Sequence, residues 1–237
     1  MKNILTIFKR EFAAYFNSPI AYVFITFYLV ITNAVFFPSF FIANRASMRN
    51  YFEMLPLFFL FFVPAITMRL WAEEKMSGTH ELLFTLPIKT GHLVLGKFLG
   101  GYAFLVMAIV LTFTIPYTIA RLGAPDWGPI IGGYIGAILM GGVYLAIGSF
   151  ASSLTRNQIV AFITGISLCF IFFILGMPTI QANLWAPLAR FAEHLSVTNH
   201  FMNTARGVLD TGDVIYSFSM IVFFLFLTLY RLESVRY

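Results

Sequence analysis

The sequence contains little charge for its length. Of its 237 residues, only 11% are Asp, Glu, Lys or Arg, whereas 59% are hydrophobic. Soluble domains carry about 25% charged residues, so this composition indicates an integral membrane protein. Basic residues exceed acidic ones by five, but they form no basic stripe interleaved with aromatic residues. We therefore interpret the surplus as loop charge that orients the chain in a membrane, and we expect no nucleic-acid partner.

Cysteine is nearly absent. Cys169 is the single one and lies in an apolar run, so one chain can form neither a disulfide nor a cysteine metal cluster. Four histidines are present, but none belongs to an HExxH motif or stands at metal-ligand spacing beside a carboxylate. We expect no metal site. We also expect no removable signal peptide, because residues 1–17 alternate charged and apolar side chains.

Titratable residues are missing from the long apolar stretches as well. Ser149, Ser152 and Ser153 supply hydroxyls there, but no histidine, lysine or acid accompanies them to activate a nucleophile. An ion-coupled transporter usually needs titratable residues near the midplane. Residues 91–97 match the start of a phosphate-binding loop, yet Phe98 follows where Ser or Thr is required. The sequence therefore predicts no catalytic residues and no cofactor bound by this chain.

Six stretches are apolar enough to cross a bilayer, which takes about 20 residues. We predict spans at residues 19–41, 51–69, 98–119, 129–152, 158–175 and 214–230. Ser18 suits the N-cap of the first span and Pro19 suits its first helical position. Residues 2–17 are predicted to form an amphipathic helix in the cytoplasmic interface, because apolar residues recur at helical spacing at Ile4, Phe8, Phe12 and Tyr15.

Loop charges give the orientation of the spans. With the N-terminus inside, ten basic residues lie on the cytoplasmic side and five on the other. Both termini are therefore predicted to be cytoplasmic, which requires an even number of spans. Between spans five and six, Pro178, Pro187 and scattered charges predict a short helical excursion, a candidate re-entrant segment. The predicted fold is a single all-α membrane domain over residues 1–237.

Small residues recur at intervals of four in the fourth span, at Gly133, Ala137 and Gly141. This spacing lets two helices approach closely. The neighbouring helix can belong to the same chain or to a second copy, and the pattern alone does not choose between them.

The loop over residues 69–97 is the longest on the cytoplasmic side. A cluster of acids, a Gly-Thr break and an apolar Leu-Leu run predict two short amphipathic helices joined at Gly78. A solvated loop helix shows the same pattern. However, the loop also resembles the first cytoplasmic loop of the ABC-2 type permeases, through Glu73, Glu74, Gly78, Thr79, Glu81, Leu82, Leu83, Pro87, Gly96 and Lys97.

The resemblance to this family extends over essentially the whole chain, because the interfacial helix, six spans and interrupted outer segment are also similar. A resemblance to one branch of the family lies near the C-terminus. There the chain resembles the gliding-motility-associated F-type branch of these permeases, in His200-Phe201, residues 206–210 and residues 213–216.

This resemblance implies a non-catalytic permease subunit in the bacterial inner membrane. It would pair with a second permease, as a homodimer or heterodimer, and dock cytoplasmic ATPases that hold ATP and magnesium. The implied coupling residues are Glu73, Glu74, Lys75, Gly78, Thr79 and Glu81. The first three would make charged contacts in a groove of the ATPase, and the N-terminal helix would be a second contact.

Two other functions fit the residues. One is a secondary transporter or channel, which would act without any ATPase. The other is a membrane scaffold that binds an ATPase but moves no substrate. A membrane enzyme is disfavoured by the missing acid, base and metal constellations.

Overall fold

The computed structural model describes residues 2–43, 45–78, 89–183 and 185–234, and within these ranges it contains helices and no strands. Five helical stretches are long and apolar enough to cross a membrane, and a sixth apolar helix, α9, is shorter. The all-helical membrane fold predicted from composition is thereby confirmed. The helices are α1 Lys2–Phe16, α2 Pro19–Ala43, α3 Arg49–Thr67, α4 Arg69–Met76, α6 Thr90–Leu111, α7 Thr114–Leu122, α8 Trp127–Leu154, α9 Gln158–Ile174, α10 Pro178–Asn183, α11 Ala186–Leu195, α12 Val197–Ala205 and α13 Thr211–Ser234.

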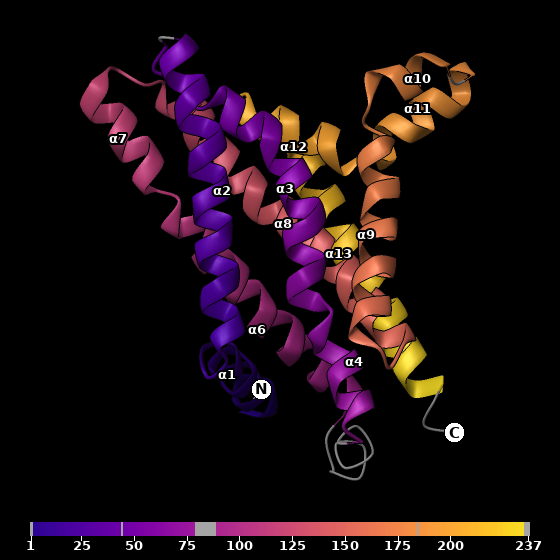
Figure 1. The fold of residues 1–237 in the computed structure, drawn as a ribbon. Coiled ribbons are helices and arrows are strands. Elements are labelled where there is room, and N and C mark those ends of the chain that lie inside the picture. The colour runs from indigo at the N-terminus through magenta and orange to yellow at the C-terminus, as the bar shows by residue number, and fades with distance from the viewer. Residues whose placement is uncertain (1, 44, 79–88, 184, 235–237) are drawn as a thin grey trace.

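Helix α8 lies at the centre of the bundle (Figure 1) and packs against α3, α4, α6, α9, α12 and α13. Its small residues allow these neighbouring helices to approach closely. A Cβ added at Gly133 would lie 2.3 Å from the Phe52 ring of α3, and one at Gly141 would lie 2.6 Å from Leu105 of α6. Ala137, between them, is also buried. The small-residue row therefore packs against helices of the same chain.

Helix α2 stands at the periphery of the bundle. Only 17% of its most apolar segment is buried against the rest of the described chain, and Val23 and Phe27 are among its exposed hydrophobic residues. A helix that is apolar all round but buried on one side suits a lipid-facing position.

The third predicted span differs from the observed helix at both ends. Helix α6 already begins at Thr90, so residues 91–97 are helical and do not form a loop that wraps phosphate. The helix then breaks between Leu111 and Thr114. Pro116 has no N–H for the Thr112 carbonyl four residues earlier, and that carbonyl accepts instead from the Ile115 N–H at 2.9 Å and from the Tyr134 hydroxyl at 3.1 Å. The missing N–H of the proline accounts for the break.

The segment between α9 and α13 forms three helices. Helices α10 and α11 project from one end of the bundle (Figure 1), whereas α12 returns to pack against α8. Val197, Phe201 and Thr204 of α12 are buried. Gly207, in the left-handed conformation at φ +88°, ends this helix. Helix α1 and the last turns of α13 both lie at the opposite end of the bundle (Figure 1).

Candidate functional site: a charged junction of α1, α4 and α6

Helix α4 continues the α3 span without a loop. The Met68 backbone between them is helical, and its N–H donates to the Pro64 carbonyl at 2.9 Å. Together, the two helices form one helical stretch, Arg49–Met76. Helix α4 is thus continuous with a helix that is long and apolar enough to span a membrane.

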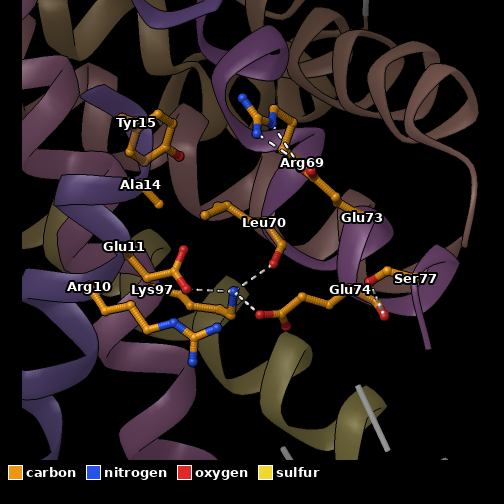
Figure 2. Close-up of a pocket in the computed structure, with 10 residues that line it drawn as sticks. All are labelled: Arg10, Glu11, Ala14, Tyr15, Arg69, Leu70, Glu73, Glu74, Ser77 and Lys97. Carbon is orange, nitrogen blue, oxygen red and sulfur yellow. Dashed lines mark hydrogen bonds and ion pairs between the residues drawn. The ribbon is translucent and has the colours of Figure 1, made fainter. Parts of the chain in front are cut away.

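Lys97 of α6 is the centre of the junction, and its side chain is only 3% exposed. Its Nζ lies 3.0 Å from Glu11 Oε1 of α1 and 2.7 Å from Glu74 Oε1 of α4, and it donates to the Leu70 carbonyl at 3.0 Å (Figure 2). An ammonium group has three donors, so these three acceptors satisfy it. The ammonium also lies 5.3 Å from the centre of the Trp71 ring. One buried cation therefore joins three helices.

Helix α1 reaches this cation because two glycines let it approach α6. A Cβ added at Gly96 would lie 2.6 Å from the Ile7 side chain, and one at Gly100 would lie 2.7 Å from Glu11 Cβ. Larger residues at these positions would push α1 away and separate Glu11 from Lys97. The sequence analysis did not predict Glu11 as a contact residue. The signal that could have identified it is an acid on the amphipathic helix, combined with the Gly-x-x-x-Gly spacing of Gly96 and Gly100 in α6.

Tyr15 is a second contact of α1 with the bundle. Its hydroxyl donates to the Ile66 carbonyl of α3 at 3.4 Å, and its ring stacks on Phe104 with centroids 4.7 Å apart. Burial raises the pKa of the Tyr15 phenol, and the neighbouring Glu11 carboxylate raises it further. The phenol therefore stays protonated and remains a donor.

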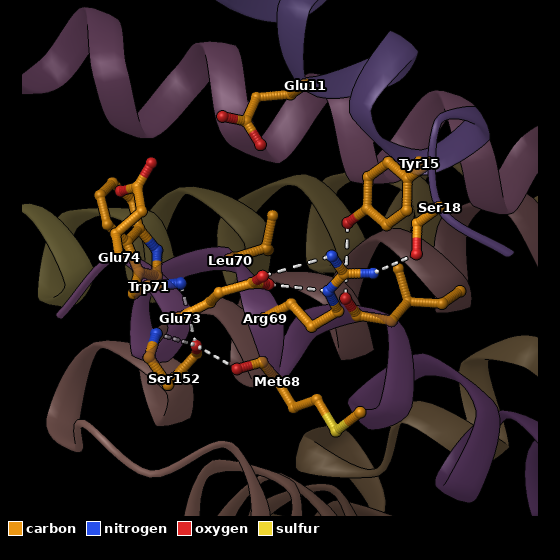
Figure 3. Close-up of polar contacts among 12 residues, drawn as sticks. Glu11, Tyr15, Ser18, Met68, Arg69, Leu70, Trp71, Glu73, Glu74 and Ser152 are labelled. Atoms are coloured by element: carbon orange, nitrogen blue, oxygen red, sulfur yellow. Dashed lines mark hydrogen bonds and ion pairs between the residues drawn. The ribbon is translucent and has the colours of Figure 1, made fainter. Parts of the chain in front are cut away.

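Serines of α8 hold α4 on its other side. Ser152 Oγ accepts from the backbone N–H groups of Trp71 and Ala72 at 3.1 and 3.2 Å, and donates to the Met68 carbonyl at 3.1 Å (Figure 3). The fully buried Trp71 indole donates to Ser149 Oγ at 3.0 Å. These two hydroxyls attach α4 to the central helix.

Arg69 links the start of α4 to the turn between α1 and α2. Its Nε lies 2.8 Å from Glu73 Oε2, and its Nη1 donates to Ser18 Oγ at 3.4 Å (Figure 3). The Glu73 side chain is 43% exposed, so this pair lies nearer to water than the Lys97 contacts do.

The predicted coupling residues differ in where they lie. Glu74, 15% exposed, turns inward onto Lys97, and the Lys75 ammonium donates to the Ser153 carbonyl of α8. Glu73 pairs with Arg69 at the junction's edge. Gly78 has a positive φ of 73°, a conformation that suits glycine in the turn after α4. Thr79 and Glu81 lie outside the described residues. Contacts with an ATPase stay a prediction for all six.

A cavity of about 250 Å³ opens beside the junction (Figure 2). Three basic and three acidic side chains contribute to its wall, so its formal charge is balanced. Its lining residues are Arg10, Glu11, Ala14, Tyr15, Arg69, Leu70, Glu73, Glu74, Ser77 and Lys97. Among the described residues, no group of three metal-ligating side chains comes together here or elsewhere. The arrangement is suited to holding these helices together through ion pairs.

Comparison with known families gives one match. A family model described as ABC-2 family transporter protein covers residues 5–233, nearly the whole chain. No curated protein matches the sequence.

Proposed function

Because the chain belongs to the ABC-2 transporter family, we propose that it is the permease subunit that couples ATP hydrolysis to movement of a substrate across or out of the membrane. Hydrolysis takes place on separate cytoplasmic ATPase subunits that hold ATP and magnesium. This chain supplies the membrane path and the helices that move. One observation carries the proposal: the junction ties the end of a span to three other helices.

We call α4 the lever, because its contacts in the junction would pass a movement of α4 on to several other helices. It continues α3, holds α6 and α1 through Lys97, and holds α8 through Ser152. Removing one partner of a buried ion pair costs about 3–5 kcal/mol, so α4 does not shift alone. A push on α4 is instead shared by α1, α3, α6 and α8. This is the property that a transmission element requires.

We propose that the ATPase contacts the exposed end of this lever. Met76, Ser77 and Gly78 are exposed at the end of α4, and Glu73 is partly exposed beside them. Thr79 and Glu81 follow directly in the chain. Glu74 and Lys75 then act inside the permease and stabilise the lever, rather than pairing with the ATPase. Lys9 and Arg10, exposed on α1, supply the second contact.

The test is purification of the tagged chain from its native host in mild detergent, with identification of co-purifying proteins and an ATPase assay. We expect a P-loop ATPase and a second permease subunit. Glu74→Gln should keep the ATPase bound but weaken the response of hydrolysis to the membrane domain. Glu53→Gln, in an exposed ion pair with Arg49, is the matched control and should change nothing.

The two rival functions give different results in the same experiment. A chain that transports a substrate without any ATPase would be a secondary transporter or channel, and the lever would lose its role. A chain that retains an ATPase, but whose reconstituted complex moves no substrate from the host envelope, would be a scaffold.

Within the family, we propose the gliding-motility-associated F-type branch, supported by His200-Phe201 and the segments 206–210 and 213–216. This assignment implies the bacterial inner membrane, with both termini cytoplasmic. Deletion of the chain from its native host should abolish movement over surfaces, with growth unchanged. Normal movement after deletion would remove this branch assignment but leave the permease proposal standing.

A further inference from the structure

Three basic side chains come together at the α4 end of the bundle, and we call them the basic cluster. The Lys75 ammonium, in the last turn of α4, donates to the Ser153 carbonyl in the last turn of α8. Arg156 follows in the turn between α8 and α9, and Arg231 lies in the last turn of α13. The charges of Arg231 and Arg156 both act on the Lys75 ammonium. Three separate elements thus direct positive charge to one place.

Packing between α8 and α13 brings the two arginines to the same level. The Phe150 ring of α8 contacts the Phe224 ring of α13, with centroids 6.1 Å apart. Arg156 follows Phe150, and Arg231 follows Phe224, by about two helical turns, which advance about 11 Å. Both helices run toward the α4 end of the bundle (Figure 1). The two side chains therefore leave the bundle at that end, close to the Ser153 carbonyl that Lys75 contacts.

The acids at this end of the bundle do not neutralise the basic cluster. Glu11, Glu73 and Glu74 pair with other cations, in the junction of α1, α4 and α6. Glu233 is two residues beyond Arg231 and therefore lies about 200° around α13 from it. Among the residues that the structure describes, none of the three cations of the cluster forms an ion pair. An anion from outside the described chain would relieve their mutual repulsion.

The surroundings of the cluster indicate which kind of anion fits. On α9, Ile159 is 69% exposed, and on α13, Phe226 is 61% exposed and Tyr230, next to Arg231, is 68% exposed. Apolar side chains at the surface of a span face acyl chains, and tyrosine is enriched at the level of the headgroups. An acidic protein surface would provide charge for the cations but no cover for these apolar side chains. An anionic lipid provides both.

The start of α9 adds to the positive charge. This helix begins at Gln158, two residues after Arg156, so the positive end of its dipole lies beside the cluster. Arginine pairs with phosphate through two parallel hydrogen bonds, and lysine acts as a point charge. Basic pockets between membrane helices bind lipid headgroups in this way.

We propose that Lys75, Arg156 and Arg231 bind the phosphate of an anionic phospholipid, in the leaflet at the α4 end of the bundle, with its acyl chains against α9 and α13. The bound lipid would join α4, the turn between α8 and α9, and α13. This site requires a membrane around the chain, but it does not depend on an ATPase.

Lipid titration of the purified chain, followed by native mass spectrometry, tests this site. The probe is phosphatidylglycerol, compared with phosphatidylcholine that carries the same acyl chains. The double variant Arg156→Gln with Arg231→Gln removes two exposed charges and leaves the bond between Lys75 and Ser153 in place. We expect its apparent affinity for the first phosphatidylglycerol to fall on the order of tenfold, since each basic residue near a membrane surface contributes to binding. Binding of phosphatidylcholine should not change.

Two further variants separate the cluster from total charge and from the fold. Arg45→Gln with Arg190→Gln removes two exposed arginines from the other end of the bundle and should bind phosphatidylglycerol as the unchanged chain does. Arg156→Lys with Arg231→Lys keeps both charges and should retain most of the affinity. The thermal denaturation midpoint without added lipid should be the same for all three double variants.

Each other result overturns the proposal. Unchanged phosphatidylglycerol binding in Arg156→Gln with Arg231→Gln would mean that the cluster holds no lipid. An equal loss in the control at the other end would mean that only total charge matters. Displacement of the lipid by millimolar inorganic phosphate would indicate a site for a soluble anion. Retained lipid binding, with loss of an ATPase that co-purifies from the native host, would make the cluster a protein contact.

Discussion

The two ends of the bundle are held together by different kinds of contact. At the α4 end, Lys97 and Ser152 are buried and bind groups from several helices, so each contact connects elements far apart in the sequence. At the α11 end, a few hydrogen bonds fix a hairpin whose apolar side chains remain exposed. The first end joins several helices through buried polar contacts. The second leaves a hairpin held by few contacts, and the predictions below test this difference from the largest expected effect to the smallest.

Replacing Lys97 with Gln should have the largest effect. It leaves the Glu11 and Glu74 carboxylates close together and without their cation, and loss of one partner from such a buried cluster costs about 3–5 kcal/mol. The free energy of unfolding in detergent, followed by thermal denaturation, should fall accordingly.

A compensating variant separates charge from packing at the same position. Adding Glu11→Gln and Glu74→Gln to Lys97→Gln removes the unpaired charges and should restore part of the lost stability. No recovery in this triple variant would indicate that Lys97 acts through its packing on Trp71, and the charged junction would lose its importance.

Replacing Ser152 with Ala should have an intermediate effect. Two backbone N–H groups of α4 lose their hydroxyl acceptor in a buried site, which costs about 1–3 kcal/mol. Ser167→Ala is the matched control, because its hydroxyl is exposed and bonds within α9. Thermal denaturation of the two variants should show a clear fall for Ser152 and nearly none for Ser167. Equal effects would mean that α8 does not hold α4 through this hydroxyl.

How far the sequence predicts these two ends depends on the kind of contact. Hydropathy indicated the long apolar helices, because a helix that faces lipid leaves a long apolar run in one segment of chain. The Glu11–Lys97 contact depends on how α1 crosses α6, which no local pattern specifies. The inward position of Glu74 was not predicted for the same reason: its spacing fits a surface contact, and Lys97, with which it pairs, is 23 residues further along the chain. The bond from the Tyr134 hydroxyl to the Thr112 carbonyl likewise joins two helices that no local pattern brings together.

Replacing Tyr216 with Phe should have the smallest effect of the three. It removes one hydrogen bond, from the hydroxyl to the Leu195 carbonyl, and a net cost of about 0.5–1.5 kcal/mol is expected. Global unfolding should change little, because α11 has few contacts with the bundle. The effect should instead be local: amide hydrogen exchange should accelerate in α11 and remain unchanged in α8. Uniform acceleration in both helices would show that the α11 end is as strongly connected as the α4 end, and the contrast between them would disappear.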